Sequence, residues 1–285
     1  MIYQFSVGRL ECVVVSDGQP GPPFEPSLGD FYTPESGVPA DVLRDACRGR
    51  STLTCGYNCL FVGTPDGTAV VDTGLGASFL GYGEYIEPLV GKLGDGMTSV
   101  GLSRSNLAAV VFTHLHQDHS RGAIWSGELT FPDATAFAHS AEVAFWSGSV
   151  DLPSARPHLE VARETIRLFG EKLRPFEYGA EILPGVQAIA APGHTPGHAA
   201  ILLQSQGERL LCVGDTFYDP LQLTNPTWAT PWDLDAPASV ASRRHLLERA
   251  ADEQILVHAY HLPFPGLGHV QRDGSTFTWH PLHDR

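Results

Sequence analysis

Residues 113–122, THLHQDHSRG, concentrate metal-binding side chains in one short stretch. Three imidazoles and one carboxylate fall within six positions, directly after the apolar run LAAVVF; they belong to His114, His116, Asp118 and His119. Imidazole and carboxylate groups together are typical ligands of catalytic zinc. In extended backbone His114 and His116 project to the same side, while the other two follow at the turn into a short helix. The stretch therefore predicts ligands for two neighbouring metal positions.

Three more candidate ligands follow three further apolar runs. His194 follows VQAIAAPG, Asp215 follows RLLCVG, and His261 follows ILVHAY. Loops at strand ends over a rigid sheet are common places for such sites. We therefore expect Asp215 to bridge two metals, the first held by His114, His116 and His194 and the second by Asp118, His119 and His261.

The donor set also indicates which metal and which chemistry to expect. Nitrogen and carboxylate ligands suit Zn²⁺, and manganese, cobalt or iron can replace it. A pair of such metals leaves room for a bridging hydroxide, which is a nucleophile at neutral pH. The sequence therefore predicts two zinc ions per chain and a hydrolytic reaction.

The elements that must position these ligands are mostly strands. Short apolar runs recur along the chain, and PDG at 65–67, between two of them, is a hairpin signal. Apolar residues at 3.6-residue spacing predict a helix within 154–173, and a later helix is expected over 237–251 with Asp235 as its N-cap. Residues 267–282 are expected to form two closing strands. This order favours an α/β or α+β sandwich with two sheets inside and helices outside.

Charge and hydropathy exclude several classes of function. The 285 residues carry 18 Lys and Arg against 32 Asp and Glu, a formal net charge of −14, and no basic run offsets it. We therefore expect no nucleic-acid partner and no anionic membrane surface. No apolar run approaches the roughly 20 residues that cross a bilayer. The N-terminus also lacks the features of a signal peptide, so the chain is expected to be cytoplasmic.

The order of candidate ligands, HxHxDH, His, Asp and His, together with VVDTG at 70–74, resembles the metallo-β-lactamase superfamily over essentially the whole chain. The resemblance implies an αββα four-layer sandwich, formed by a single domain over 1–285, with the metals at one edge. It also implies that Asp72 supports the metal site by orienting a ligand imidazole. His198 in HTPGH is expected to be a hydrogen-bonding neighbour of the site.

Two branches of this superfamily are similar to different parts of the chain. AYHLPFPGLGHV near the C-terminus resembles methyl parathion hydrolase, in which an aromatic residue matching Trp146 lines the leaving-group pocket. Tyr218 stands three residues after Asp215, where the N-acyl homoserine lactonases carry a tyrosine whose hydroxyl contacts the substrate carbonyl oxygen. Such a donor stabilises charge that appears only in the transition state. We therefore predict a lactone or carboxylic ester hydrolase, most similar to quorum-quenching lactonases.

The predicted reaction gives a few residues specific roles. In the expected reaction, the bridging hydroxide attacks the carbonyl carbon of the substrate. One metal polarises the carbonyl group with help from Tyr218, and Asp118 then carries a proton to the leaving alkoxide. An apolar pocket wall is expected from Phe79, Trp146 and Phe217, for each of which core packing is the alternative. Five other histidines are expected to be solvated or structural: His139, His158, His245, His280 and His283.

Two alternatives to this function stay open at the level of the sequence. One is an organophosphate triesterase of the methyl parathion hydrolase type, and the other is a non-catalytic metal-binding protein. By analogy with relatives that are often dimers, a homodimer is among the expected assemblies, with the loop 18–37 as a contact segment.

Overall fold

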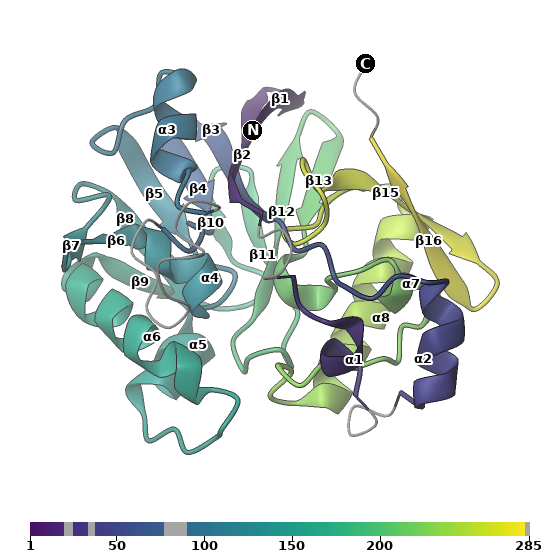
Figure 1. The fold of residues 1–285 in the computed structure, drawn as a ribbon. Coiled ribbons are helices and arrows are strands. Elements are labelled where there is room, and N and C mark those ends of the chain that lie inside the picture. Colours follow the sequence, from purple (N-terminus) through teal and green to yellow (C-terminus); the bar gives the residue numbers. More distant parts are fainter. Residues whose placement is uncertain (20–24, 34–37, 77–89, 283–285) are drawn as a thin grey trace.

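Two large β-sheets form the centre of the computed structural model, which describes residues 1–19, 25–33, 38–76 and 90–282 (Figure 1). In spatial order, the first sheet contains β1 (Ile2–Val7), β2 (Leu10–Gly18), β3 (Tyr57–Thr64), β4 (Gly67–Val71), β5 (Leu107–Val111), β8 (Thr135–His139) and β9 (Leu173–Phe176). The second contains β10 (Glu181–Leu183), β11 (Val186–Ala190), β12 (Ala199–Ser205), β13 (Glu208–Cys212), β14 (Leu256–His258), β15 (Leu267–Asp273) and β16 (Thr276–Pro281). A small ribbon pairs β6 (Ile124–Trp125) with β7 (Glu128–Leu129).

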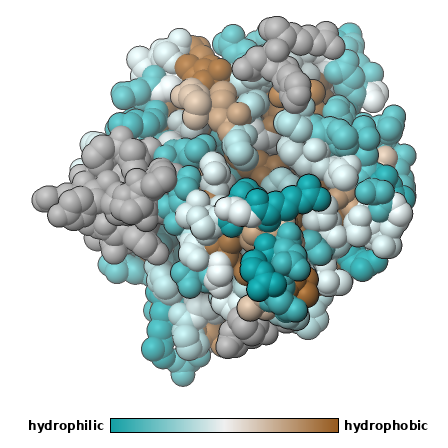
Figure 2. All heavy atoms as spheres, turned by 45° about the vertical axis from the view of Figure 1, so that its right-hand side comes forward, coloured by the Kyte–Doolittle hydropathy of each residue, from teal (hydrophilic) through white to brown (hydrophobic). Residues whose placement is uncertain are grey.

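Helices cover the outer faces of both sheets (Figure 1). Beside the first sheet are α3 (Leu93–Ser99), α4 (Gln117–Ser120), α5 (Ser140–Ser147) and α6 (Arg156–Phe169). On the side of the second sheet are α1 (Leu28–Phe31), α2 (Ala40–Cys47), α7 (Leu221–Thr224) and α8 (Ala236–Asp252). Figure 2 turns this second side forward and shows apolar atoms in the middle of a mostly hydrophilic face.

Alternating side chains along the strands build separate layers of the core. Val14 and Leu60 belong to the cluster between the sheets, which also contains Ile201 of β12. Their chain neighbours Val15 and Phe61 belong to the outer cluster beneath α3, α5 and α6. A third cluster joins the outer face of the second sheet to α8. Because successive strand residues face opposite ways, apolar runs without alternation fill both faces, and the αββα four-layer sandwich is confirmed.

The strand directions bring four loop ends to one edge of the sandwich. In the first sheet β4, β5, β8 and β9 are mutually parallel neighbours, and in the second sheet β13 and β14 are parallel. The carboxyl ends of parallel strands meet at the same sheet edge, which is where ligand-bearing loops of such sheets lie. The segments after β5, β13 and β14 and the β11–β12 loop lie together at this edge, although more than 140 residues separate His114 from His261.

Several local expectations are confirmed. The hairpin at 65–67 joins β3 to β4 with Thr64 opposite Gly67, and residues 267–282 form the two closing strands β15 and β16. The expected helices are α6 and α8, and the Asp235 side chain caps α8 by accepting from the Ala238 N–H at 3.0 Å. No helix in the described part of the chain is long and apolar enough to cross a membrane. In the loop 18–37, residues 20–24 and 34–37 lie outside the described residues.

Candidate metal centre

Four segments at one edge of the sandwich carry the predicted ligands. The loop after β5 holds residues 114–119, the β11–β12 loop holds His194, and the segments after β13 and β14 hold Asp215 and His261. At His116 the backbone is still extended, with φ −61° and ψ 151°, and α4 begins at the next residue. The backbone therefore changes from extended to helical inside the HxHxDH motif. This change turns the side chains of the motif toward His194, Asp215 and His261 of the second sheet.

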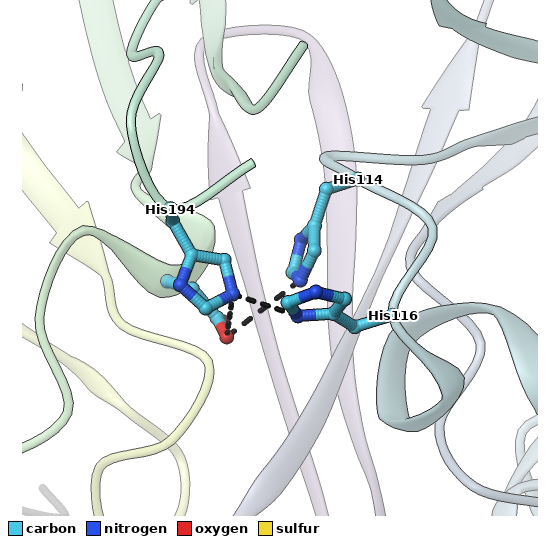
Figure 3. A group of neighbouring side chains, drawn as sticks. His114, His116 and His194 are labelled. Carbon is cyan, nitrogen blue, oxygen red and sulfur yellow. Dashed lines mark hydrogen bonds and ion pairs between the residues drawn. The ribbon is translucent and has the colours of Figure 1, made fainter. Parts of the chain in front are cut away.

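The seven side chains form two groups that share one carboxylate. The groups are His114, His116, His194 and Asp215, and Asp118, His119, Asp215 and His261. Within each group the donor atoms lie within 4.8 Å of one another. In the first group His116 Nδ1 lies 2.8 Å from His194 Nε2 (Figure 3). In the second, Asp215 Oδ1 lies 2.9 Å from His119 Nε2 and 3.1 Å from His261 Nε2.

These donors fit divalent cations. The six side chains other than Asp118 are at most 3% exposed, so their polar atoms have no access to bulk water. His114 Nε2 has no hydrogen-bond partner among the described residues and lies 3.7 Å from Asp215 Oδ2. A buried polar atom without a partner needs a compensating group. Nitrogen and carboxylate donors in two adjoining groups suit a pair of zinc ions.

Charges within the centre shift its pKa values in opposite directions. Burial acts to lower the pKa of His119, but the neighbouring carboxylates, Asp215 foremost, raise it to about 10. In His194 burial again acts to lower the pKa, and Asp215 and Asp233 raise it to about 9. Burial acts to raise the pKa of Asp215, but the surrounding imidazoles hold it well below its usual range. Asp215 is therefore a buried anion that requires balancing positive charge.

Asp72 lies where the VVDTG motif predicts it, against a histidine of the second group. Its Oδ2 is 2.8 Å from His119 Nδ1 and accepts from Thr113 Oγ1 at 2.8 Å, while Oδ1 accepts from the Thr113 N–H at 2.9 Å. The backbone of Asp72 has φ +57°, a conformation that non-glycine residues rarely adopt and that is found at functional sites. These contacts turn the other ring nitrogen of His119 toward Asp215.

Two further orienting groups were not expected from the sequence. Asp233 Oδ1 lies 3.3 Å from His194 Nδ1 and accepts from Ser239 Oγ at 2.8 Å. Cys55 Sγ lies 3.0 Å from His261 Nδ1. Neither residue belongs to a motif of recognisable spacing, so only the folded chain identifies them. They contact the Nδ1 atoms of two candidate ligand rings, whose Nε2 atoms face Asp215.

Glu142 of α5, also missed from the sequence, joins the two loops that carry the first group. Its Oε1 accepts from the Leu115 N–H at 2.9 Å and from Trp146 Nε1 at 2.6 Å. Its Oε2 accepts from Thr195 Oγ1 at 2.6 Å and from the Gly197 N–H at 3.0 Å. Burial raises the pKa of this completely buried carboxyl, and the four hydrogen bonds oppose that rise. One side chain thereby ties the HxHxDH loop to the HTPGH loop.

His198 occupies the position expected of a hydrogen-bonding neighbour. Its Nε2 accepts from the Asp215 N–H at 3.0 Å, and its Nδ1 donates to the Ala191 carbonyl at 2.9 Å. Gly214 lies against this ring with φ +50°, and a Cβ there would come within 2.6 Å of His198 Nε2. The glycine therefore permits the close approach that sets the backbone of Asp215.

The expected pocket wall requires correction. Trp146 is completely buried in the core beneath α5, with its ring centroid 5.6 Å from that of His116. Phe217 is also completely buried and packs 6.2 Å from Trp279. Its backbone is extended, with φ −155° and ψ 154°, so Phe217 and Tyr218 face opposite ways. Phe79 lies outside the described residues.

His158, which was expected to be solvated or structural, packs against a histidine of the centre. Its ring stacks on His116 with centroids 3.9 Å apart and planes at 24°, and its Nδ1 accepts from the Gln117 N–H at 3.3 Å. His158 is on α6, more than 35 residues after the motif. Local sequence therefore carried no signal of this contact.

Zinc binding should release protons. In the metal-free chain at pH 7, His119, His194 and His261 each carry a second ring proton, because the pKa values of the first two, about 10 and about 9, lie above that pH and Asp215 helps to raise the pKa of His261 well above its usual range. Coordination requires an unprotonated nitrogen, so about three protons should leave per chain on zinc loading. Calorimetric zinc titration in buffers of different ionisation enthalpy measures this number. A count near zero would contradict the assignment of these three residues as ligands.

Replacing Glu142 by Gln should destabilise the fold. Each carboxylate oxygen of Glu142 accepts two hydrogen bonds, and an amide nitrogen in the place of one oxygen cannot accept them. Glu142→Gln should therefore leave two buried donors without an acceptor and lower the free energy of unfolding by about 2–4 kcal/mol. Urea denaturation of the zinc-loaded protein measures the change. Glu160→Gln, at an exposed position of α6, is the matched control and should change stability little. Equal effects of the two substitutions would refute the bridging role.

Comparison with known proteins places the chain in a family. A family model described as the metallo-beta-lactamase superfamily matches residues 53–258, more than two thirds of the chain. An N-acyl homoserine lactonase of Bacillus sp. is 25% identical over 218 residues, which cover 71% of this chain and 80% of that protein. The probable metallo-hydrolase YflN of Bacillus subtilis (strain 168) is 29% identical over 209 residues, which cover 66% of this chain and 71% of that protein.

Solved structures share the fold over the full length. The structure of AidC, described as a dizinc quorum-quenching lactonase in complex with a product, aligns with a TM-score of 0.87 at 24% identity. The alignment covers 100% of this chain and 98% of that chain. The hydrolase AbOPH aligns with a TM-score of 0.85 at 23% identity over the same shares. With two sheets, outer helices and clustered His and Asp side chains at one edge, the chain belongs to the metallo-beta-lactamase superfamily.

Proposed function

We propose that this protein is a dinuclear zinc hydrolase that opens lactones or cleaves carboxylic esters, with lactones as the better substrates. The observation that carries the proposal is the position of the Tyr218 hydroxyl, which donates to Asp215 Oδ2 at 2.8 Å and lies 3.2 Å from His194 Nδ1. A neutral phenol beside the shared carboxylate is suited to contact a carbonyl oxygen there. Relatives named N-acyl homoserine lactonase support the choice of substrate class.

Tyr218 keeps its proton under the conditions of the reaction. Burial raises the pKa of its hydroxyl well above the usual range, and the nearby carboxylates of Asp215 and Asp233 raise it further. A hydroxyl that stays protonated has one hydrogen to donate, which goes to Asp215 Oδ2 in this structure and which rotation about the C–O bond can redirect to the substrate carbonyl oxygen. As the carbonyl oxygen gains negative charge, this donor stabilises the transition state more than the ground state.

The proposed reaction adds one water to the carbonyl carbon and breaks the ester carbon–oxygen bond. The chemistry that bound zinc supplies is polarisation of the carbonyl oxygen and a nucleophilic water at neutral pH. Asp118 is the most exposed of the ligands, with 23% of its side chain accessible, and its Oδ2 lies 3.4 Å from His261 Nε2. It is therefore placed to pass the water's proton to the leaving alkoxide, which yields a hydroxy acid from a lactone.

Next to Tyr218, the exposed face of Trp232 supplies an apolar surface for the rest of the substrate, and the buried Phe31 supports it. Trp232 is 38% exposed and lies 5.8 Å from the Tyr218 ring. Phe31 of α1 lies edge-on to both rings, 5.1 Å from Tyr218 and 4.9 Å from Trp232. Trp146 and Phe217 are buried in the core and take no part in this apolar surface.

Because the candidate ligands come from both sheets, we propose that residues 1–285 form one catalytic domain.

A substrate panel tests the function directly. We expect kcat/KM of the zinc-loaded protein for an acyl homoserine lactone to exceed that for a dimethyl aryl phosphotriester by at least about a hundredfold, roughly 2.7 kcal/mol in transition-state binding. Tyr218→Phe should lower kcat/KM for the lactone about 10- to 100-fold at unchanged zinc content. A faster phosphotriester reaction would favour the triesterase, and no hydrolysis of any ester would favour a non-catalytic metal protein.

The leaving group reveals the role of Asp118. A poor leaving alkoxide needs a proton, whereas an aryl oxide of low basicity leaves without one. Asp118→Asn should therefore lower kcat on an alkyl lactone far more than on a 4-nitrophenyl ester, by about tenfold or more in the ratio of the two. Bound zinc is measured in parallel, because metal loss would reduce both reactions alike. Equal losses on both substrates would rule out proton transfer by Asp118.

A further inference from the structure

An ion pair outside the metal centre joins the segment that carries Tyr218 to a distant part of the chain. Arg50 Nη1 lies 2.7 Å from Asp219 Oδ2, and Arg50 Nη2 lies 2.9 Å from Asp219 Oδ1. The Asp219 side chain is 4% exposed, whereas that of Arg50 is 47% exposed. Ion pairs between two exposed groups contribute little, but a two-bond pair onto a buried carboxylate has a fixed geometry.

The partner of Arg50 is the residue directly after Tyr218. Asp219 Oδ1 also accepts from the Leu221 N–H at 2.8 Å, and the Asp219 carbonyl accepts from the Gln222 N–H at 2.9 Å. Gln222 Oε1 in turn accepts from the Tyr218 N–H at 2.9 Å. Hydrogen bonds among residues 218–222 therefore hold the backbone on both sides of the Tyr218 Cα. The ion pair of Arg50 with Asp219 connects these residues to the segment that leads into β3.

Residues 50–56 also contact the other parts of the substrate side. The Leu28 N–H donates to the Ser51 carbonyl at 3.0 Å, which places α1 and its Phe31 against the Tyr218 ring. At the far end of the same segment, the Gly56 N–H donates to the His261 carbonyl at 2.9 Å. The Tyr218 ring itself stacks on His261 at 5.0 Å. Arg50 therefore begins a short segment that borders Tyr218 from two directions.

We propose that Arg50 is a positioning residue, which acts through Asp219 to keep the Tyr218 hydroxyl at the shared carboxylate of the metal centre. The inference rests on the proposed role of Tyr218 in the hydrolysis of lactones. Without the guanidinium, the buried Asp219 carboxylate loses its charged partner and its fixed orientation. The distance between the hydroxyl of the adjoining Tyr218 and Asp215 is then no longer fixed. A hydrogen-bond donor displaced from the oxyanion by even a fraction of the hydrogen-bond length stabilises the transition state less.

A double-mutant cycle tests this inference with Arg50→Met, Tyr218→Phe and the double variant, each loaded with zinc and assayed on an acyl homoserine lactone. Arg50→Met should lower kcat about tenfold with a smaller change in KM. In the Tyr218→Phe background the same substitution should change kcat by less than about twofold, because the hydroxyl on which it acts is absent. Arg50→Lys keeps the charge but not the two-bond geometry and should be intermediate; it replaces Arg50→Met if that variant does not fold.

Arg272→Met is the matched control. Arg272 of β15 pairs with Asp252 of α8 through Nη2, at 2.8 Å from Oδ1 and 3.0 Å from Oδ2, and both side chains are exposed. This substitution should leave kcat unchanged. Bound zinc and the thermal unfolding midpoint are measured for every variant, and we expect zinc content to stay at the wild-type value.

The outcomes separate the two proposals. If Tyr218→Phe lowers kcat but Arg50→Met lowers it equally in both backgrounds, the positioning role is wrong and the role of Tyr218 stands. If Tyr218→Phe has no effect on the lactone, both are overturned. Loss of zinc in Arg50→Met would assign Arg50 to the stability of the metal centre and would also overturn its action through the hydroxyl.

Discussion

The buried carboxylate of Asp215 is the interaction on which the rest of the site depends. It lies between imidazoles from both sheets, within 3.2 Å of His119, His194 and His261. A carboxylate with 2% exposure is costly unless positive charge surrounds it. The fold meets this requirement by ending strands of both sheets at one edge, so that the imidazoles and any bound cations collect around a single anion.

Keeping these groups in place requires a rigid environment, which buried carboxylates supply. Asp72 holds His119 from a backbone conformation that is unusual for a non-glycine residue. Glu142 joins the two loops of the first group through four hydrogen bonds. Each of these anions is fully buried and hydrogen-bonded, so displacement of any ligand loop would leave charge or donors unpaired. The metal side of the centre is thereby preorganised.

The proposed substrate side is assembled differently, from pieces of chain that are short and far apart in sequence. Phe31, Tyr218 and Trp232 meet edge to face. They are connected by hydrogen bonds of residues 50–56 and by the pair of Arg50 with Asp219, rather than by strands of either sheet. Changes in these short segments would therefore leave the two sheets intact.

The sequence by itself determined the α/β or α+β class, the two long helices α6 and α8 and the set of candidate ligands, because short apolar runs, helical spacing and the HxHxDH pattern are local and show in linear order. The four-layer order followed from the resemblance to the superfamily. The sequence did not identify Glu142, Asp233, Cys55 or Arg50, since each acts on a partner distant in sequence or outside any motif. The sequence also assigned Phe217 and Trp146 to a pocket wall, whereas both side chains are buried in the core. The extended backbone at Phe217 turns its side chain away from that of Tyr218, and the packing of α5 buries Trp146. Which side chains face a site depends on contacts between distant segments, and only the tertiary structure decides those contacts.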